Sequence, residues 1–446
     1  MNNFNDHDGN CGISALSLFS GRNVQDQVIQ SIPEIIHPVN SLTGTQVIEF
    51  VVAGNENFID MHTVELLLKV RIKNIDNSNL AAVVAAAPAA VPPVPAAGQI
   101  ALINYPIASL FQHVDVFLNN DLVSNTSNYG IKAYLETICN FGHDASKSWL
   151  QAGGYYKDTH NQMNTLSDDN KGFKSRRDLL AQSRILELCG KIHSELFNQD
   201  SLLLNHVDLR IVFTRHSDAF CLHAAAGDNV KIELMDAWIK LNRSVVTAQV
   251  SNKVESLLQK QDIRYFVDRG VVKSYTFAPG RRDINVRNSV TSRDVPTKII
   301  VFMVSNTAFN GSKAENPYNF QHFNMTSADI TIDSQSVYAK PLVGDFATGQ
   351  YLQFFNTIPS GMGYKYADAG CLISREEYPH GFTFVCADLT ATQCNAQYED
   401  PTRSGILDIA LKFSQPLAVT VNVIVYMQFS NTISINASRR AVTDFT

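Results

Sequence analysis

Apolar and polar residues alternate through residues 405–429. Apolar side chains stand at every second position over 407–413 and again over 419–429, and Gln415-Pro416 separates the two runs. A period of two is that of a strand with one buried and one wet face, and proline suits a turn or a strand end. The pattern therefore predicts an antiparallel strand pair in a sandwich or barrel.

The same pattern predicts elements earlier in the chain. Residues 63–74 form one strand, and residues 113–124 form two strands around a turn at Asn119-Asn120-Asp121. Over 128–142 the period changes to that of a helix. Residues from about 150 to 180 are polar and are expected to be a loop, and strand patterns then continue to Ile435. Many short strands separated by Asn, Gly, Pro and Ser turns indicate an all-β sandwich architecture.

Three strand patterns recur in the same order at similar offsets. The matched ranges are 63–70 with 297–304, 114–123 with 328–337, and 207–215 with 407–415. An ordered set of matches favours two similar β-sandwiches of roughly 200 residues in tandem. The expected division is an N-terminal arm, 1–40; a first sandwich, 41–243; a linker, 244–264; a second sandwich, 265–436; and a C-terminal tail, 437–446.

Composition narrows the function classes. The net charge is −6, and charged residues make up 17% of the chain. Because nucleic-acid affinity comes largely from Lys and Arg, extensive direct DNA or RNA binding by the folded body is not expected. The local basic spots at 174–177, 281–282 and 439–440 are expected to be solvated charge.

Cysteine usage and the N-terminus indicate a reducing compartment. The chain has seven cysteines at wide spacing without a CxxC pair, which argues against a disulfide framework and a structural zinc site. Residues 1–12 lack the features of a secretory signal. Residues 80–98 are apolar but contain four prolines, so we expect a proline-rich loop rather than a membrane-spanning helix.

The sequence contains none of the short motifs that carry catalysis. Phosphate-binding loops, HExxH and GxSxG are absent. Three histidines lie near strands and four aspartates lie in or beside strands, and ordinary structural roles are expected for all of them: His113, His206, His216, Asp115, Asp208, Asp329 and Asp408. We therefore predict no catalytic, cofactor-binding or metal-ligating residues, no cofactor, and a structural or binding protein rather than an enzyme.

Four segments in this order resemble the major capsid protein of Polinton (Maverick) elements and adintoviruses, a hexon-like family. The segments are 114–124, 129–142, 308–324 and 403–439, and the likeness runs from about residue 45 to 440. The pieces that carry most of it are the helix, Asn316-Pro317-Tyr318-Asn319-Phe320, and the final strands. Residues 80–98 and about 155–172 are peculiar to this sequence.

The resemblance implies an all-β double jelly roll: two tandem eight-stranded jelly rolls with a short helical insertion in the first. It further implies a homotrimer of pseudo-hexameric outline that tiles an icosahedral shell around double-stranded DNA without sequence-specific binding. Neighbouring trimers and a single jelly-roll penton or minor capsid protein would be its partners. The protein would reside in the virion, after synthesis in reducing cytosol and assembly in cytoplasm or nucleus. The arm and the tail are expected to contact neighbours or the shell interior.

Two alternatives stay open at this point. A lectin-like or receptor-binding tandem β-sandwich, such as a spike or minor capsid protein, has the same fold signature, because fold alone does not decide function. An enzyme of the cupin or metal-hydrolase kind is disfavoured by the missing His/Glu metal pattern.

Overall fold

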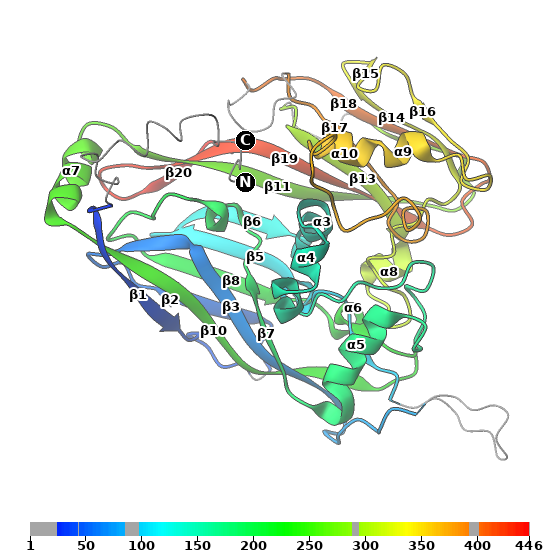
Figure 1. Cartoon of the computed structure of the whole chain (residues 1–446), viewed down its shortest axis with the longest axis horizontal. Helices are drawn as coiled ribbons and strands as arrows, with labels where there is room; N and C mark the ends of the chain where they lie inside the picture. The colour runs from blue at the N-terminus through cyan, green and yellow to red at the C-terminus, as the bar shows by residue number, and fades with distance from the viewer. Residues whose placement is uncertain (1–24, 43, 85–97, 288–293, 392–400, 446) are drawn as a thin grey trace, which may run out of the picture.

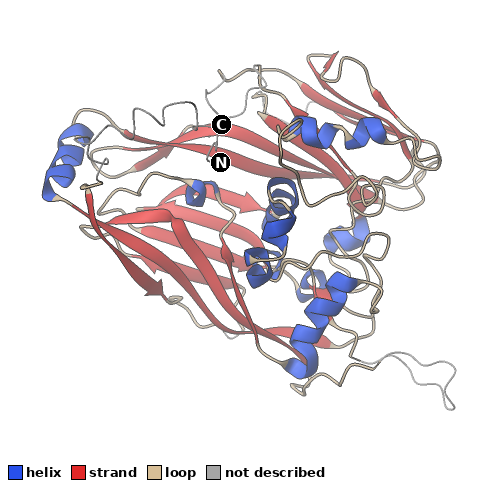
Figure 2. Cartoon of the chain, in the orientation of Figure 1, coloured by secondary structure: helices blue, strands red, loops and turns tan. Residues whose placement is uncertain are grey.

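The computed structural model describes residues 25–42, 44–84, 98–287, 294–391 and 401–445. Two β-sandwiches lie side by side, and helices gather between them and at one end (Figures 1 and 2). The first sandwich consists of the sheets β1-β10-β3-β7 and β2-β8-β5-β6. Its strands are β1 (Val28–Ile36), β2 (Val47–Val52), β3 (Phe58–Asn74), β5 (Phe111–Leu118), β6 (Asp121–Ser127), β7 (Leu186–Lys191), β8 (Leu209–Arg215) and β10 (Val230–Val246).

The second sandwich consists of the sheets β11-β19-β13-β17 and β12-β18-β14-β15. Its strands are β11 (Ile263–Phe277), β12 (Asp283–Val286), β13 (Lys298–Ser305), β14 (Met325–Ile332), β15 (Gln335–Ser336), β17 (Phe384–Asp388), β18 (Leu407–Phe413) and β19 (Val421–Ile435). The short strands β16 (Leu342–Val343) and β20 (Ala441–Thr443) pair with β14 and β19, and β4 (Ala101–Leu102) pairs with β9 (Leu222–His223).

Both sandwiches have the same strand order. Numbered along its own part of the chain, each has one sheet of strands 1-8-3-6 and one of strands 2-7-4-5. This order defines a jelly roll, so the predicted double jelly roll is confirmed. The three predicted sequence matches fall on equivalent strands: β3 with β13, β5-β6 with β14-β15, and β8 with β18.

The phase of one match is wrong. At the predicted offset Leu66 corresponds to Ile300, yet Leu66 faces the core of its sandwich whereas Ile300 shares the outer face with Tyr426. A shift of one residue exchanges the two faces of a strand. The sequence of β13 could not reveal the phase, because its residues from Ile299 to Val304 are all buried and do not alternate.

The predicted pairing of the last two strands is also wrong. Both strands exist, as β18 and β19, but they belong to opposite sheets. In a jelly roll the seventh and eighth strands lie in different sheets, so the residues around Gln415-Pro416 cross between sheets instead of forming a hairpin. The hairpin predicted at 113–124 is confirmed: β5 pairs with β6, and Asn119 and Asn120 both have positive φ, at 47° and 70°.

The helices are short and lie in connections between strands. They are α2 (Pro106–Ser109), α3 (Tyr129–Asn140), α4 (His143–Ser146), α5 (Lys171–Leu180), α6 (Asp218–Cys221), α7 (Ala248–Leu258), α8 (Asn306–Asn310), α9 (Leu352–Phe355), α10 (Thr357–Gly361) and the 3-10 helices η1 (Trp149–Gly153), η2 (Ala181–Ser183) and η3 (Glu195–Asn198). The helix predicted over 128–142 is α3. The expected loop at about 150–180 instead contains η1 and α5.

Three segments outside the predicted sandwiches carry regular structure. Strand β1 lies within the predicted arm and pairs with β10, because its residues complete the edge of the first sheet. Helix α7 lies in the predicted linker, and β20 lies in the predicted tail. The division of the chain at 244–264 itself stays a prediction.

Candidate functional site at the junction of the two jelly rolls

Helix α3 joins the two jelly rolls. It follows β6 after Asn128, whose left-handed conformation (φ 52°) is one that asparagine tolerates. Ten of its twelve residues are buried. A helix that is buried all round lies between layers of protein. It contacts α2 and β5 of the first jelly roll and β11 of the second.

A stacked tyrosine pair fixes the second jelly roll on α3. The rings of Tyr134 and Tyr318 are parallel within 5°, with centroids 4.0 Å apart. The Tyr318 hydroxyl donates to the carbonyl oxygen of Gly130 at 3.1 Å. Phe320 meets Tyr134 edge-on, with ring centroids 6.0 Å apart. The pair joins a helix of the first jelly roll to the segment 316–320, which precedes β14.

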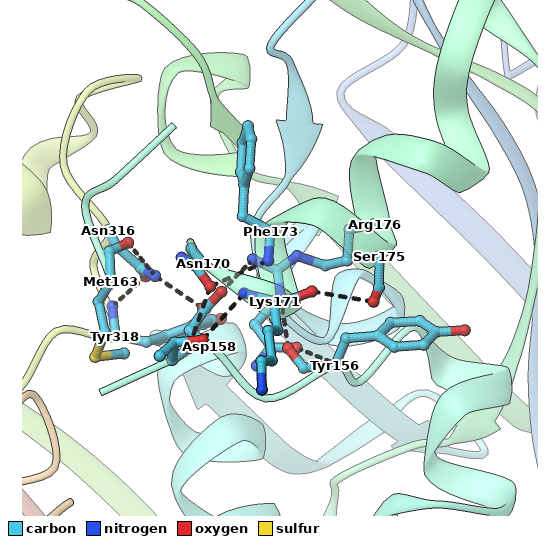
Figure 3. A network of polar contacts seen from close by, with 12 residues as sticks. Tyr156, Asp158, Met163, Asn170, Lys171, Phe173, Ser175, Arg176, Asn316 and Tyr318 are labelled. Carbon is cyan, nitrogen blue, oxygen red and sulfur yellow. Dashed lines mark hydrogen bonds and ion pairs between the residues drawn. The ribbon is translucent and has the colours of Figure 1, made fainter. Parts of the chain in front are cut away.

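A buried ion pair extends this junction (Figure 3). Arg176 of α5 donates to Asp158 Oδ1 at 2.8 Å and to the carbonyl oxygens of Leu102 at 2.9 Å and Tyr156 at 2.6 Å. The other carboxylate oxygen of Asp158 accepts a hydrogen bond from Asn316 Nδ2 at 3.0 Å. The side chains of Arg176 and Asp158 are 2% and 0% exposed. Because both charges are fully buried, each depends on the other for compensation.

Asn170, the residue before α5, caps this helix beside the ion pair. Asn170 Oδ1 accepts hydrogen bonds from Phe173 N at 3.3 Å and from Thr159 N at 3.2 Å. The first is an N-cap, which satisfies a free N–H group at the start of the helix. The cap orients α5 so that Arg176 points at Asp158 (Figure 3).

A second buried ion pair lies in the first turn of α3. Lys132 Nζ is 2.7 Å from Glu195 Oε1, which also accepts from the Gly270 N–H of β11 at 3.2 Å. Ser124 Oγ donates to Glu195 Oε2 at 2.6 Å. Burial opposes ionisation of Glu195, but the Lys132 ammonium and these hydrogen bonds hold the pKa of its carboxyl below the ordinary value.

Helix α3 and its surroundings also cover the outer face of β19. The alternation predicts a half-polar face there, yet Asn422, Ile424 and Tyr426 are 1%, 0% and 6% exposed. The Tyr426 hydroxyl donates to Glu136 of α3 at 3.2 Å. The sheet β11-β19-β13-β17 is therefore buried on both faces around this strand.

Sequence reasoning missed the charged residues of the junction. The spot at 174–177 was expected to be solvated, but Arg176 and Arg177 are buried. Arg281 and Arg282 are exposed, as expected, and Arg439 is partly buried beside Glu255 of α7. Only the resemblance to a known family could have pointed to this junction from the sequence. Two of the segments that carry the resemblance, α3 and 316–320, meet in the junction. The third contains β19, which α3 covers.

Three of the other residues considered for chemistry make ordinary structural contacts: His216, Asp115 and Asp208. The His216 ring stacks on Phe220 with centroids 3.8 Å apart, and burial lowers the pKa of His216 to about 4. Asp115 accepts from Asn125 at 2.6 Å, and Asp208 accepts from the Gly54 N–H at 2.7 Å.

Among the residues that the structure describes, no group of His, Cys, Asp and Glu side chains is arranged to hold a metal ion. Within the same residues no helix combines the length and apolarity needed to cross a bilayer.

The strand order defines a double jelly roll, and solved structures from virus particles share this fold at low sequence identity. A chain of the Sputnik virophage particle superposes with a TM-score of 0.63 at 12% identity, covering 97% of this chain and 92% of that chain. The Faustovirus major capsid protein gives 0.60 at 8% identity, with 93% and 92% covered. The mavirus major capsid protein gives 0.53 at 12% identity, with 97% and 94% covered.

Sequence comparison adds one relative. An uncharacterized protein of Caenorhabditis elegans is 23% identical over 354 residues, which cover 77% of this chain and 81% of the relative. No protein-family model matches the chain. Of the superposed proteins, those of Faustovirus and mavirus are major capsid proteins.

Proposed function

We propose that this chain is the major capsid protein of a double-stranded DNA virus or of a virus-like mobile element of the Polinton and adintovirus kind. One observation carries the proposal: two jelly rolls of identical strand order are held in one chain by a buried junction. The segments that resemble Polinton and adintovirus capsid proteins include the parts that build this junction. The fold shared with the Faustovirus and mavirus major capsid proteins supports the same assignment.

The architecture explains why one gene product suffices for a shell. Three chains present six similar jelly rolls, so a trimer has a nearly hexagonal outline and fills a hexagonal lattice. A closed ring of this kind is an ordinary outcome for homo-oligomers. The junction matters here, because it fixes the angle between the two jelly rolls of each chain.

The proposal includes the surroundings of the protein. Its partners are two further copies in the trimer, neighbouring trimers, and a single jelly-roll protein at the vertices, all within the virion shell. The net charge of −6 fits a shell that encloses double-stranded DNA without reading its sequence. The role requires neither catalysis nor a cofactor.

Negative-stain electron microscopy combined with light scattering tests the proposal. Purified protein is expected to give particles of three times the 49.4 kDa chain mass with a hexagonal outline, or closed shells. A chain that stays monomeric at micromolar concentration contradicts it. In that case a glycan array decides whether the sandwiches are a carbohydrate-binding protein instead.

A further inference from the structure

A polar cleft of about 480 Å³ lies between the two jelly rolls, beside the buried junction. Residues from 161–165 of the first jelly roll form one wall, and residues from 319–324 and 379–381 of the second form the others. All three segments lie in connections between strands. The carbonyl oxygen of Met163 accepts a hydrogen bond from Asn316 Nδ2 at 3.3 Å, so the cleft adjoins the Arg176–Asp158 network (Figure 3). Its volume falls in the range of about 300–1,000 Å³ that is typical of small-molecule sites.

Hydrogen bonds across the junction tie the walls of the cleft together. The Asn161 N–H donates to the carbonyl oxygen of His380 at 3.2 Å. The Asn316 N–H, just before the second wall, donates to Asn164 Oδ1 at 2.9 Å. The cleft is therefore already formed in the free chain, which lowers the entropic cost of binding a ligand there.

The wall 319–324 contains a backbone conformation that is rare for residues other than glycine. Phe323 and Asn324 follow one another with φ values of 45° and 54°. Such conformations cost free energy and cluster at ligand sites, where the surrounding structure enforces them. Here the Asn324 N–H donates to His322 Nδ1 at 2.9 Å, and the His322 ring stacks on Phe346 with centroids 4.2 Å apart. These contacts hold the loop in shape.

The cleft carries no strong charge. Among the described residues that line it there is no Asp, Glu, Lys or Arg. Burial, together with the nearby His380, lowers the pKa of His322 to about 4, so this ring is uncharged at pH 7. A charged ligand would lose its hydration here without gaining a counter-charge, so the cleft suits a neutral ligand.

Carboxamide side chains dominate the lining. There are five of them: Asn161, Asn164, Asn319, Gln321 and Asn324. In the part of the chain that the structure describes, only the Asn164 side chain has a hydrogen-bonding partner, so the other four are available to a ligand.

These groups match the hydroxyls of a sugar. A carboxamide offers one acceptor and two donors, and a hydroxyl both donates and accepts, so one carboxamide can pair with two neighbouring hydroxyls. Phe323 lines the same cleft and is partly exposed, and its ring can pack against the C–H groups of a sugar.

We propose that this cleft binds a neutral oligosaccharide through its Asn and Gln side chains. The inference goes beyond the proposed function, because it gives the chain a means of attaching its particle to neutral glycans on a cell surface. Residues 161–165 belong to the stretch that is peculiar to this sequence, so the wall that they form gives the site a specificity of its own.

A glycan array with the purified wild-type protein tests the site. Neutral oligosaccharides that end in a hexose or an N-acetylhexosamine are expected to bind, and sialylated or sulfated ones are not. Asn319→Ala and Gln321→Ala each remove an unpartnered carboxamide and should weaken binding severalfold, and the double variant should weaken it about tenfold or more. The matched control is Asn310→Ala, an exposed carboxamide at the end of α8 outside the cleft, which should bind like the wild type.

Several results would overturn the inference. They are binding confined to acidic glycans, capture of peptides on a parallel peptide array without glycan binding, and unchanged glycan binding by the double variant. Saturation-transfer NMR with the same neutral oligosaccharides detects weak binding, so no signal in either experiment also overturns it. Light scattering separates this inference from the proposed function. A trimer that binds no glycan overturns only the site, and a monomer that binds glycans overturns only the proposed function.

Discussion

Removing the charge of Asp158 is expected to destabilise the junction strongly. The variant Asp158→Asn keeps the shape of the side chain but leaves the Arg176 guanidinium, 2% exposed, without its counter-charge. Breaking a buried ion pair by removing one partner costs about 3–5 kcal/mol. The remaining hydrogen bonds of Arg176 to the carbonyl oxygens of Leu102 and Tyr156 do not replace the charge.

The matched control is Asp168→Asn, which removes a carboxylate from the same region. Asp168 pairs with Arg177 at 2.7 Å and with Lys174 at 3.0 Å, but its side chain is 58% exposed. Exposed pairs contribute about 0–1 kcal/mol. Urea unfolding, followed by circular dichroism at pH 7, should therefore show a much larger loss for Asp158→Asn. Equal losses in the two variants would refute the reasoning that burial makes the Arg176–Asp158 pair important.

Three further predictions concern packing and pH. Gly270→Ala should lower the free energy of unfolding by about 1–3 kcal/mol, since the new Cβ would lie 2.8 Å from Lys132 Cε. The control Gly227→Ala, whose new Cβ would have nothing within 4 Å, should change the melting temperature little. Tyr318→Ala should lower the free energy of unfolding by about 3–5 kcal/mol and Tyr318→Phe by about 1 kcal/mol, because phenylalanine keeps the ring stack and loses one hydrogen bond. Similar unfolding midpoints for the two variants would argue against a stabilising role of the stack. Burial lowers the pKa of His223 to about 4, so the folded state binds fewer protons than the unfolded state, and the stability gained above about pH 6.5 is lost as the pH falls toward 4. For His223→Phe, the loss of stability between pH 7 and pH 5 should be smaller than in the wild type by about 2 kcal/mol, and an unchanged loss would contradict this.

The sequence predicts the strands well where one face is wet. In β8 and β18 a buried side chain stands at every second position, so the alternation is clear in the sequence. The predicted match between these two strands has the correct phase. In β13 both faces are buried, so the strand was found but its phase was not. The sequence also could not predict that β18 and β19 belong to opposite sheets, because the sheet that a strand joins depends on contacts with strands far away in the sequence.

The junction was predicted only in part. The helical period over Ile131, Tyr134 and Ile138 is a local signal and located α3. Arg176 donates to Leu102, Tyr156 and Asp158, which lie far from it in the sequence, and no local pattern encodes such a pairing. A basic run is usually solvated, and here the tertiary structure overrides that expectation.

Cryo-electron microscopy of the purified wild-type protein tests the central claim most directly. The account predicts particles with a threefold axis, each built from three chains and six similar jelly rolls. Monomers, or an oligomer without a threefold axis, would contradict it.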